Sequence, residues 1–107
     1  MPNGKDKNLV RLELSCEEFY ARHGAWPVWA TVDPMILWDL AHLLDADDFH
    51  TLASKLEFRT REGAGIVVGY GRHEVSYDHV GSETRSVPLG GAAGWLALQY
   101  REAPHTD

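Results

Sequence analysis

Residues 34–44 constrain the fold more than any other stretch, because they predict a helix that has almost no polar side. The pair Asp33 and Pro34 is a strong helix start, since an aspartate can cap the first turn and proline suits its first position. Within the stretch, only Asp39 and His42 carry polar side chains. A surface helix usually leaves about half of its circumference polar. We therefore expect most of this helix to be covered, either by the rest of the chain or by a second molecule.

The length of 107 residues predicts one domain with a modest core. We expect a flexible arm at residues 1–8, a folded domain at residues 9–102 and a flexible tail at residues 103–107. No apolar run approaches the roughly 20 residues of a membrane span, and the N-terminus lacks the apolar core of a secretory signal. The single cysteine, Cys16, cannot form an internal disulfide. These features predict a cytoplasmic protein that does not contact membranes.

Hydrophobic periodicity and turn residues predict an α+β fold. The predicted strands are residues 9–14, 28–32, 56–61, 66–68 and 73–80. The predicted helices are residues 15–23, 34–44, 45–56 and 91–101, the first of them begun by a capping box from Ser15 to Glu18. We expect a small, mostly antiparallel sheet made of a C-terminal three-stranded meander plus one or two N-terminal strands. Three to four helices would form a single layer on one face of this sheet.

The net charge is −6, and the acids are concentrated in one part of the chain. Residues 13–48 contain eight of the 16 acids and one of the 10 bases. Such a field repels nucleic acid and favours basic partners, so we expect no direct nucleic-acid binding. The acids either form a solvated face or, with nearby aromatic side chains, dock onto a basic protein. The candidate partner-binding residues are Glu17, Glu18, Trp26, Trp29, Asp39, Asp45, Asp47 and Asp48.

The apolar helix provides a second possible interface, because it could pair with its own copy in a homodimer. The candidate self-association residues are Leu37, Leu40 and Leu44, while Trp38 is expected in the core. Both interfaces predict the same class of protein: a small non-enzymatic interaction module of the inhibitor or adaptor type, without a cofactor.

The alternative class is a metal-binding protein or an acid–base enzyme. Asp39 and His42 share the polar side of the apolar helix, and His50 follows in the next helix, so the three could bind a transition metal. The predicted strand at residues 73–80 carries His73, Tyr77 and His79, which could act in acid–base chemistry. Neither set has a specific metal or catalytic spacing, and Cys16 is expected to be inert because two glutamates follow it.

Overall fold

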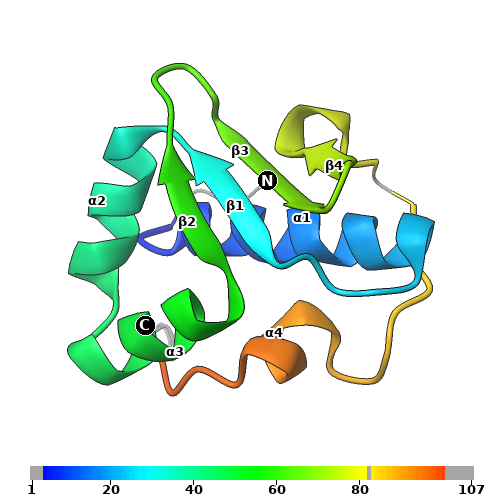
Figure 1. Ribbon diagram of the computed structural model, residues 1–107. Coiled ribbons are helices and arrows are strands. Elements are labelled where there is room, and N and C mark those ends of the chain that lie inside the picture. Colours follow the sequence, from blue (N-terminus) through cyan, green and yellow to red (C-terminus); the bar gives the residue numbers. More distant parts are fainter. Residues whose placement is uncertain (1–3, 82, 101–107) are drawn as a thin grey trace.

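The first element is a helix where a strand was predicted. In the computed structural model, which describes residues 4–81 and 83–100, helix α1 (Lys7–His23) runs for 17 residues (Figure 1). The predicted strand at residues 9–14 is therefore wrong, and Ser15 lies within α1 rather than at its start. The largest buried side chains of α1 recur every three or four positions: Leu9, Leu12, Cys16 and Phe19. This helical spacing extends over three turns, whereas the alternation that predicted a strand covers six residues.

The start of α1 also changes the predicted N-terminal boundary. Lys7 and Asn8 were assigned to a flexible arm, but they begin α1. Asn8 is buried, and its Nδ2 donates a hydrogen bond to Asp39 Oδ2 at 2.9 Å. The predicted tail at residues 103–107 lies outside the described residues.

Four strands form one sheet in the order β2-β1-β3-β4. The strands are β1 (Trp29–Val32), β2 (Glu57–Thr60), β3 (Ile66–Tyr70) and β4 (His73–Ser76). Strand β1 is parallel to β2 and antiparallel to β3, and β3 is antiparallel to β4. The predicted α+β class with a mostly antiparallel sheet is confirmed, but the three-stranded meander is wrong because β1 lies between β2 and β3. Strand β2, whose side chains are mostly polar and exposed, lies at an edge of the sheet, where polar side chains are common. The more buried strands β1 and β3 lie in the middle.

Two α-helices join β1 to β2, because parallel neighbours need a long crossover. They are α2 (Pro34–Leu43) and α3 (Ala46–Lys55). Both predicted helix starts are confirmed: Asp33 Oδ1 accepts a hydrogen bond from the Met35 N–H at 2.9 Å. Asp45 Oδ1 likewise accepts from the Asp48 N–H at 2.8 Å.

The C-terminal elements are shorter than predicted. Strand β4 ends at Ser76, whose Oγ accepts a hydrogen bond from the N–H of Asp78 in the 3₁₀ turn η1 (Tyr77–His79). Helix α4 (Gly91–Leu96) ends at Ala97, which has a positive φ of 55°. This left-handed conformation stops a helix that the sequence pattern extended to residue 101.

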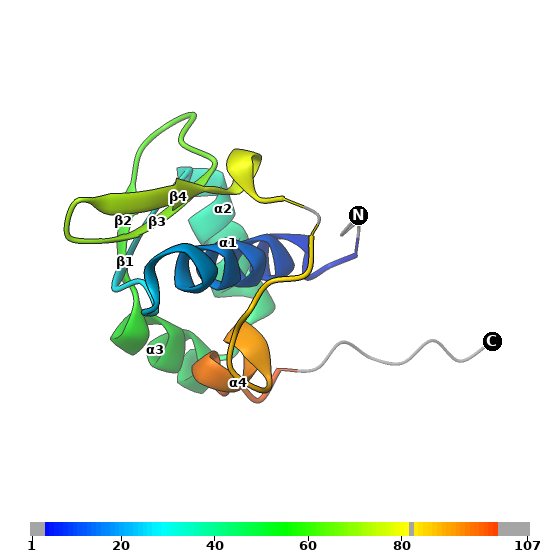
Figure 2. The ribbon, with the colours of Figure 1, turned by 90° about the vertical axis from the view of Figure 1, so that its right-hand side faces the viewer.

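The core lies between the sheet and the helices. Helix α1 runs along one face of the sheet, and α4 packs on the side of α1 away from β3 and β4 (Figure 2). Helices α3 and α4 lie at the end of the sheet where β1 and β2 begin (Figure 1). Ala30, Val68 and Val75 point from the sheet into this core. No helix of the described part is both long and apolar enough to cross a membrane.

Candidate functional site

The outer side of α2 exposes two large apolar side chains, Met35 and Trp38. Leu40 and Leu44, predicted for self-association, are buried in the core, and Leu37 is half-buried against it. Met35 and Trp38 are instead 67 % and 56 % exposed. The prediction that Trp38 lies in the core is therefore wrong. The sequence showed that α2 has an excess of apolar residues, but its outer side could not be identified without the packing of α1 and α3.

A hollow lies beside this surface. It has a volume of about 510 Å³ and is formed where α2 meets α3. Its lining is mostly apolar and consists of Ala41, Leu44, Asp45, Ala46, Phe49, His50 and Ala53. The Trp38 ring stacks on His42, with ring centroids 3.9 Å apart. Trp38 and Ala41 are three residues apart on one helix, so they lie on the same side of α2, and Ala41 borders the hollow.

Most of the acids predicted for partner binding accept hydrogen bonds within the chain. Glu17 Oε2 accepts from the Ala92 N–H at 2.9 Å, which joins α1 to α4. Asp48 is buried, and its two carboxylate oxygens accept from the N–H groups of Gln99 and Tyr100. Asp39 accepts from Asn8, and Asp45 caps α3. Asp47 stays exposed in the first turn of α3.

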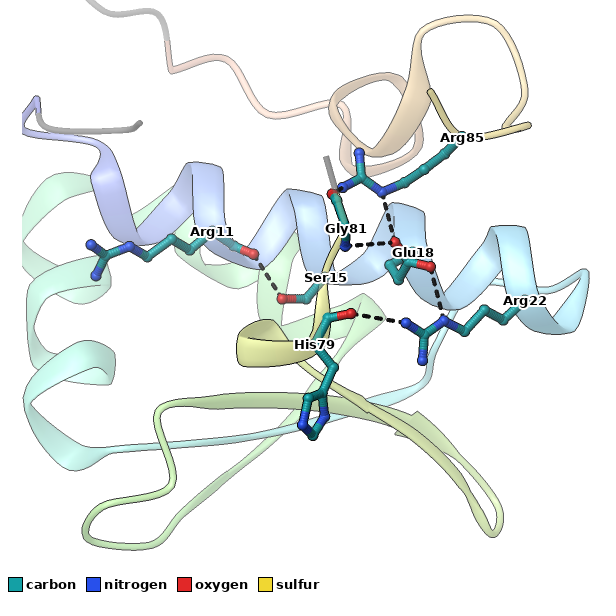
Figure 3. A network of polar contacts seen from close by, with 7 residues as sticks. All are labelled: Arg11, Ser15, Glu18, Arg22, His79, Gly81 and Arg85. Carbon is teal, nitrogen blue, oxygen red and sulfur yellow. Dashed lines mark hydrogen bonds and ion pairs between the residues drawn. The ribbon is translucent and has the colours of Figure 1, made fainter. Parts of the chain in front are cut away.

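Glu18 is the centre of a polar network that joins α1 to the segment after β4 (Figure 3). Its carboxylate accepts from Arg22 Nε at 2.8 Å, from Arg85 Nε at 3.1 Å and from the Gly81 N–H at 3.4 Å. Burial raises the pKa of the Glu18 carboxyl, but these donors outweigh it and hold that pKa below its ordinary value. Arg22 also donates to the His79 carbonyl at 2.9 Å. The network stabilises the fold and leaves Glu18 without a free oxygen for a partner.

The two other candidate tryptophans also make contacts within the chain. Trp26 stacks on Trp95 with ring centroids 4.8 Å apart. Trp29 lies across Gly69 on the neighbouring strand, where any added Cβ would be only 2.1 Å from the indole. The Arg59 guanidinium covers the Trp29 ring at 5.1 Å. Both rings are half-buried by these contacts.

The residues of the two predicted histidine sites make other contacts. His42 stacks on Trp38, while Asp39 bonds to Asn8. His73 stacks on His23 with ring centroids 4.4 Å apart, and it lies on β4, whereas His79 lies in η1. Within residues 4–81 and 83–100, no three His, Cys, Asp or Glu side chains gather in a way that could hold a metal ion.

Cys16 lies in the middle of α1, not in the first turn of a helix as predicted. It is fully buried, and burial together with Glu13 and Glu17 raises the pKa of its thiol. The thiol therefore stays protonated, which is unfavourable for nucleophilic chemistry.

Glu13 lines a pocket of about 430 Å³ between α1 and the C-terminal segment, together with Asp6 and Leu98. Burial, and then the negative charges of Glu17 and Asp6, raise the pKa of the Glu13 carboxyl to about 7. The folded state therefore favours the neutral acid. The stability that the raised pKa of Glu13 contributes is fully present below the ordinary pKa of 4.5, and it is lost as the pH rises through about 7.

The variant Glu13→Gln should remove this pH dependence. We expect its melting temperature to match that of the wild type at pH 5 and to exceed it at pH 8. At pH 8 the variant should gain about 1 kcal/mol in the free energy of unfolding, a value reduced to allow for screening of the charge by solvent. Melting curves of both proteins between pH 5 and pH 8 test this, with the exposed acid variant Glu62→Gln as the control. Parallel curves for wild type and Glu13→Gln would contradict the prediction.

Arg11 is the residue that the sequence analysis missed. The strand prediction placed it on a polar face, whereas in α1 its Nε is buried without a hydrogen-bond partner among the described residues. The apolar stripe of Leu9, Leu12 and Cys16 gave no signal for this, because on a helix Arg11 lies well to one side of that stripe. Comparison of the chain with protein-family models, curated proteins and solved structures finds no match.

Proposed function

We propose that this protein is a non-enzymatic interaction module whose partner is a second copy of itself, bound through the outer side of α2. The observation that supports this most is the exposure of Met35 and Trp38, at 67 % and 56 %, on one helix. They are three residues apart and therefore lie on the same side of α2. Adjacent exposed apolar side chains are typical of interfaces, and tryptophan is enriched among the residues that contribute most to binding.

A second copy is the best occupant because the surface is self-complementary. The exposed Trp38 lies three residues before Ala41, which borders the hollow of about 510 Å³. In a two-fold symmetric dimer with antiparallel α2 helices, each Trp38 would enter the hollow of the other copy. The volume lies in the range of cavities that hold small organic groups.

The first experiment is sedimentation equilibrium of the untagged protein at micromolar concentration. We expect the wild type to dimerise and Trp38→Glu to weaken the dimer about a hundredfold or more, because a charge replaces a central aromatic contact. Ala53→Arg should have a similar effect, because it fills the hollow on the exposed side of α3. Leu89→Glu is the matched control, since Leu89 is fully exposed far along the chain from α2.

Mixing the two dimer-defective variants separates an interface from a loss of folding. Trp38→Glu keeps an intact hollow, and Ala53→Arg keeps an intact Trp38. Together they should form a heterodimer with one native contact and one contact between the introduced carboxylate and the introduced guanidinium. A monomeric wild type, a Trp38→Glu dimer or a mixture that does not associate would overturn the proposal.

The two competing hypotheses have less support. Docking onto a basic protein would need free acids, but Glu17, Glu18, Asp39, Asp45 and Asp48 all accept hydrogen bonds within the chain. A metal site would need three ligating side chains in one place, and no such group occurs among the described residues. Neither hypothesis accounts for the exposed side of α2.

A further inference from the structure

Arg11 differs from the arginines that form ion pairs. Arg22 and Arg85 pair with Glu18, and Arg59 pairs with Glu57. The Arg11 side chain points away from the Glu18 network (Figure 3). Its Nε is enclosed and has no hydrogen-bond partner in the part of the chain that the structure describes. Buried donors in native proteins are almost always satisfied, so this one indicates a partner that lies outside the described residues.

Arg11 lines a pocket of about 260 Å³ that is separate from the hollow beside α2. Four segments of the chain contribute to its wall: α1, α2, the start of β3 with the turn before it, and η1. The lining residues are Arg11, Ile36, Gly65, Ile66, Tyr77 and Asp78. The Arg11 Cζ lies 5.7 Å from the centroid of the Tyr77 ring. Stacking of this kind holds a guanidinium in place, so the charge of Arg11 is positioned before any ligand arrives.

The pocket contains both signs of charge. Asp78 lines the same space as Arg11, and no ion pair joins the two residues. A ligand with only negative groups, such as phosphate, would be attracted by Arg11 and repelled by Asp78. A ligand with a carboxylate and an ammonium group on one carbon satisfies both charges at once. Ile36 and Ile66 add an apolar wall for the remainder of such a ligand.

We infer that this pocket binds a free α-amino acid with an apolar side chain. Arg11 holds the carboxylate, because a guanidinium matches its geometry with two parallel hydrogen bonds. Asp78 receives the ammonium group, and the ligand side chain lies against Ile36 and Ile66. The volume is below the roughly 300 Å³ at which pockets for drug-sized molecules begin, which suits a single amino acid better than a peptide.

Isothermal titration calorimetry with L-leucine is the direct test. We expect saturable binding of one leucine per chain. Two analogues separate the charges: leucinamide lacks the carboxylate, and N-acetyl-leucine lacks the ammonium group. Each should bind about tenfold or more weakly than leucine, because each leaves one charged side chain without its partner. No saturable binding of leucine would overturn the inference. Equal binding of N-acetyl-leucine would also overturn it, since that result describes a site for carboxylates in general.

Two variants assign the roles of the charged residues. Arg11→Met should abolish leucine binding, whereas Arg72→Met, at an exposed arginine of the β3–β4 turn, should leave it unchanged. Asp78→Asn should weaken leucine about tenfold and leave N-acetyl-leucine unaffected, because only leucine carries the ammonium group. Because Asp78 is exposed, Asp78→Asn should fold, and it tests binding of the ammonium group even if Arg11→Met does not fold. An Asp78→Asn protein that loses both ligands equally, or neither, would overturn the assignment.

Discussion

Replacement of Asp48 by alanine is expected to remove about 3–5 kcal/mol of the free energy of unfolding. Asp48 is 4 % exposed and accepts backbone hydrogen bonds from Gln99 at 2.7 Å and Tyr100 at 2.8 Å. Both are bonds to a charged acceptor, and their loss would leave two N–H groups to find other partners. A domain of this size is stabilised by only about 5–15 kcal/mol, so the variant should be close to unfolding. Urea denaturation of the variant and the wild type measures the difference.

Asp48→Asn is the matched control for this prediction. Asparagine has the same shape but only one acceptor oxygen, so it should retain one of the two backbone bonds and lose roughly half as much stability. Asp47→Ala, one position earlier and exposed, should change the stability by less than about 1 kcal/mol. If Asp48→Ala and Asp47→Ala proved equally mild, Asp48 would not anchor the C-terminal segment.

Replacement of Glu18 by alanine is expected to cost about 3 kcal/mol, because it leaves the guanidinium of Arg85 without its carboxylate. The side chains of Glu18 and Arg85 are only 13 % and 14 % exposed. Hydrogen exchange should also become faster in the segment from Gly81 to Gly90, which this network attaches to α1. Urea denaturation and amide exchange measure the two effects.

A second ion pair supplies the control for Glu18. Glu57 and Arg59 have the same type of contact at 3.0 Å, but their side chains are 70 % and 52 % exposed. Glu57→Ala should therefore change stability by no more than about 1 kcal/mol. Comparable losses for Glu18→Ala and Glu57→Ala would contradict the role of burial.

The pH dependence of the Glu18 contribution has the opposite sign to that of Glu13. Because the pKa of Glu18 is lowered in the folded state, its contribution is present above the ordinary value of 4.5 and is lost as the pH falls through the lower folded pKa. Stability should therefore decline at acidic pH in the wild type, and less so in Glu18→Gln.

Several helix ends could be predicted from the sequence because they depend on residues close together in the chain. The starts of α2 and α3 depend on Asp33 and Asp45, whose carboxylates bond to N–H groups two or three residues away. The end of α1 depends on Gly24, which adopts a φ of 76° that glycine tolerates at no steric cost. These features need no information about distant residues, so the starts of α2 and α3 and the end of α1 were predicted correctly, whereas the capping box at Ser15 was wrong.

The candidate sites were less predictable, because a residue's role depends on which side of its helix is covered. Trp38 and Leu40 are two residues apart in one apolar run, and only the packing of α2 decides that one is exposed and the other buried. Asp48 looked like a surface acid near a helix start, but the C-terminal segment covers it. Arg11 belonged to a short run that fits both a strand and a helix.

The sequence by itself determined the α+β class, the N-terminal caps of α2 and α3 and the excess of apolar residues in α2, because each follows from residue type and short-range spacing. Only the tertiary structure decided that residues 9–14 are helical, that β1 separates β2 from β3, and which acids are available at the surface. The physical reason is that burial and strand pairing are long-range: they depend on free energies shared between segments far apart in the chain, which no local pattern records.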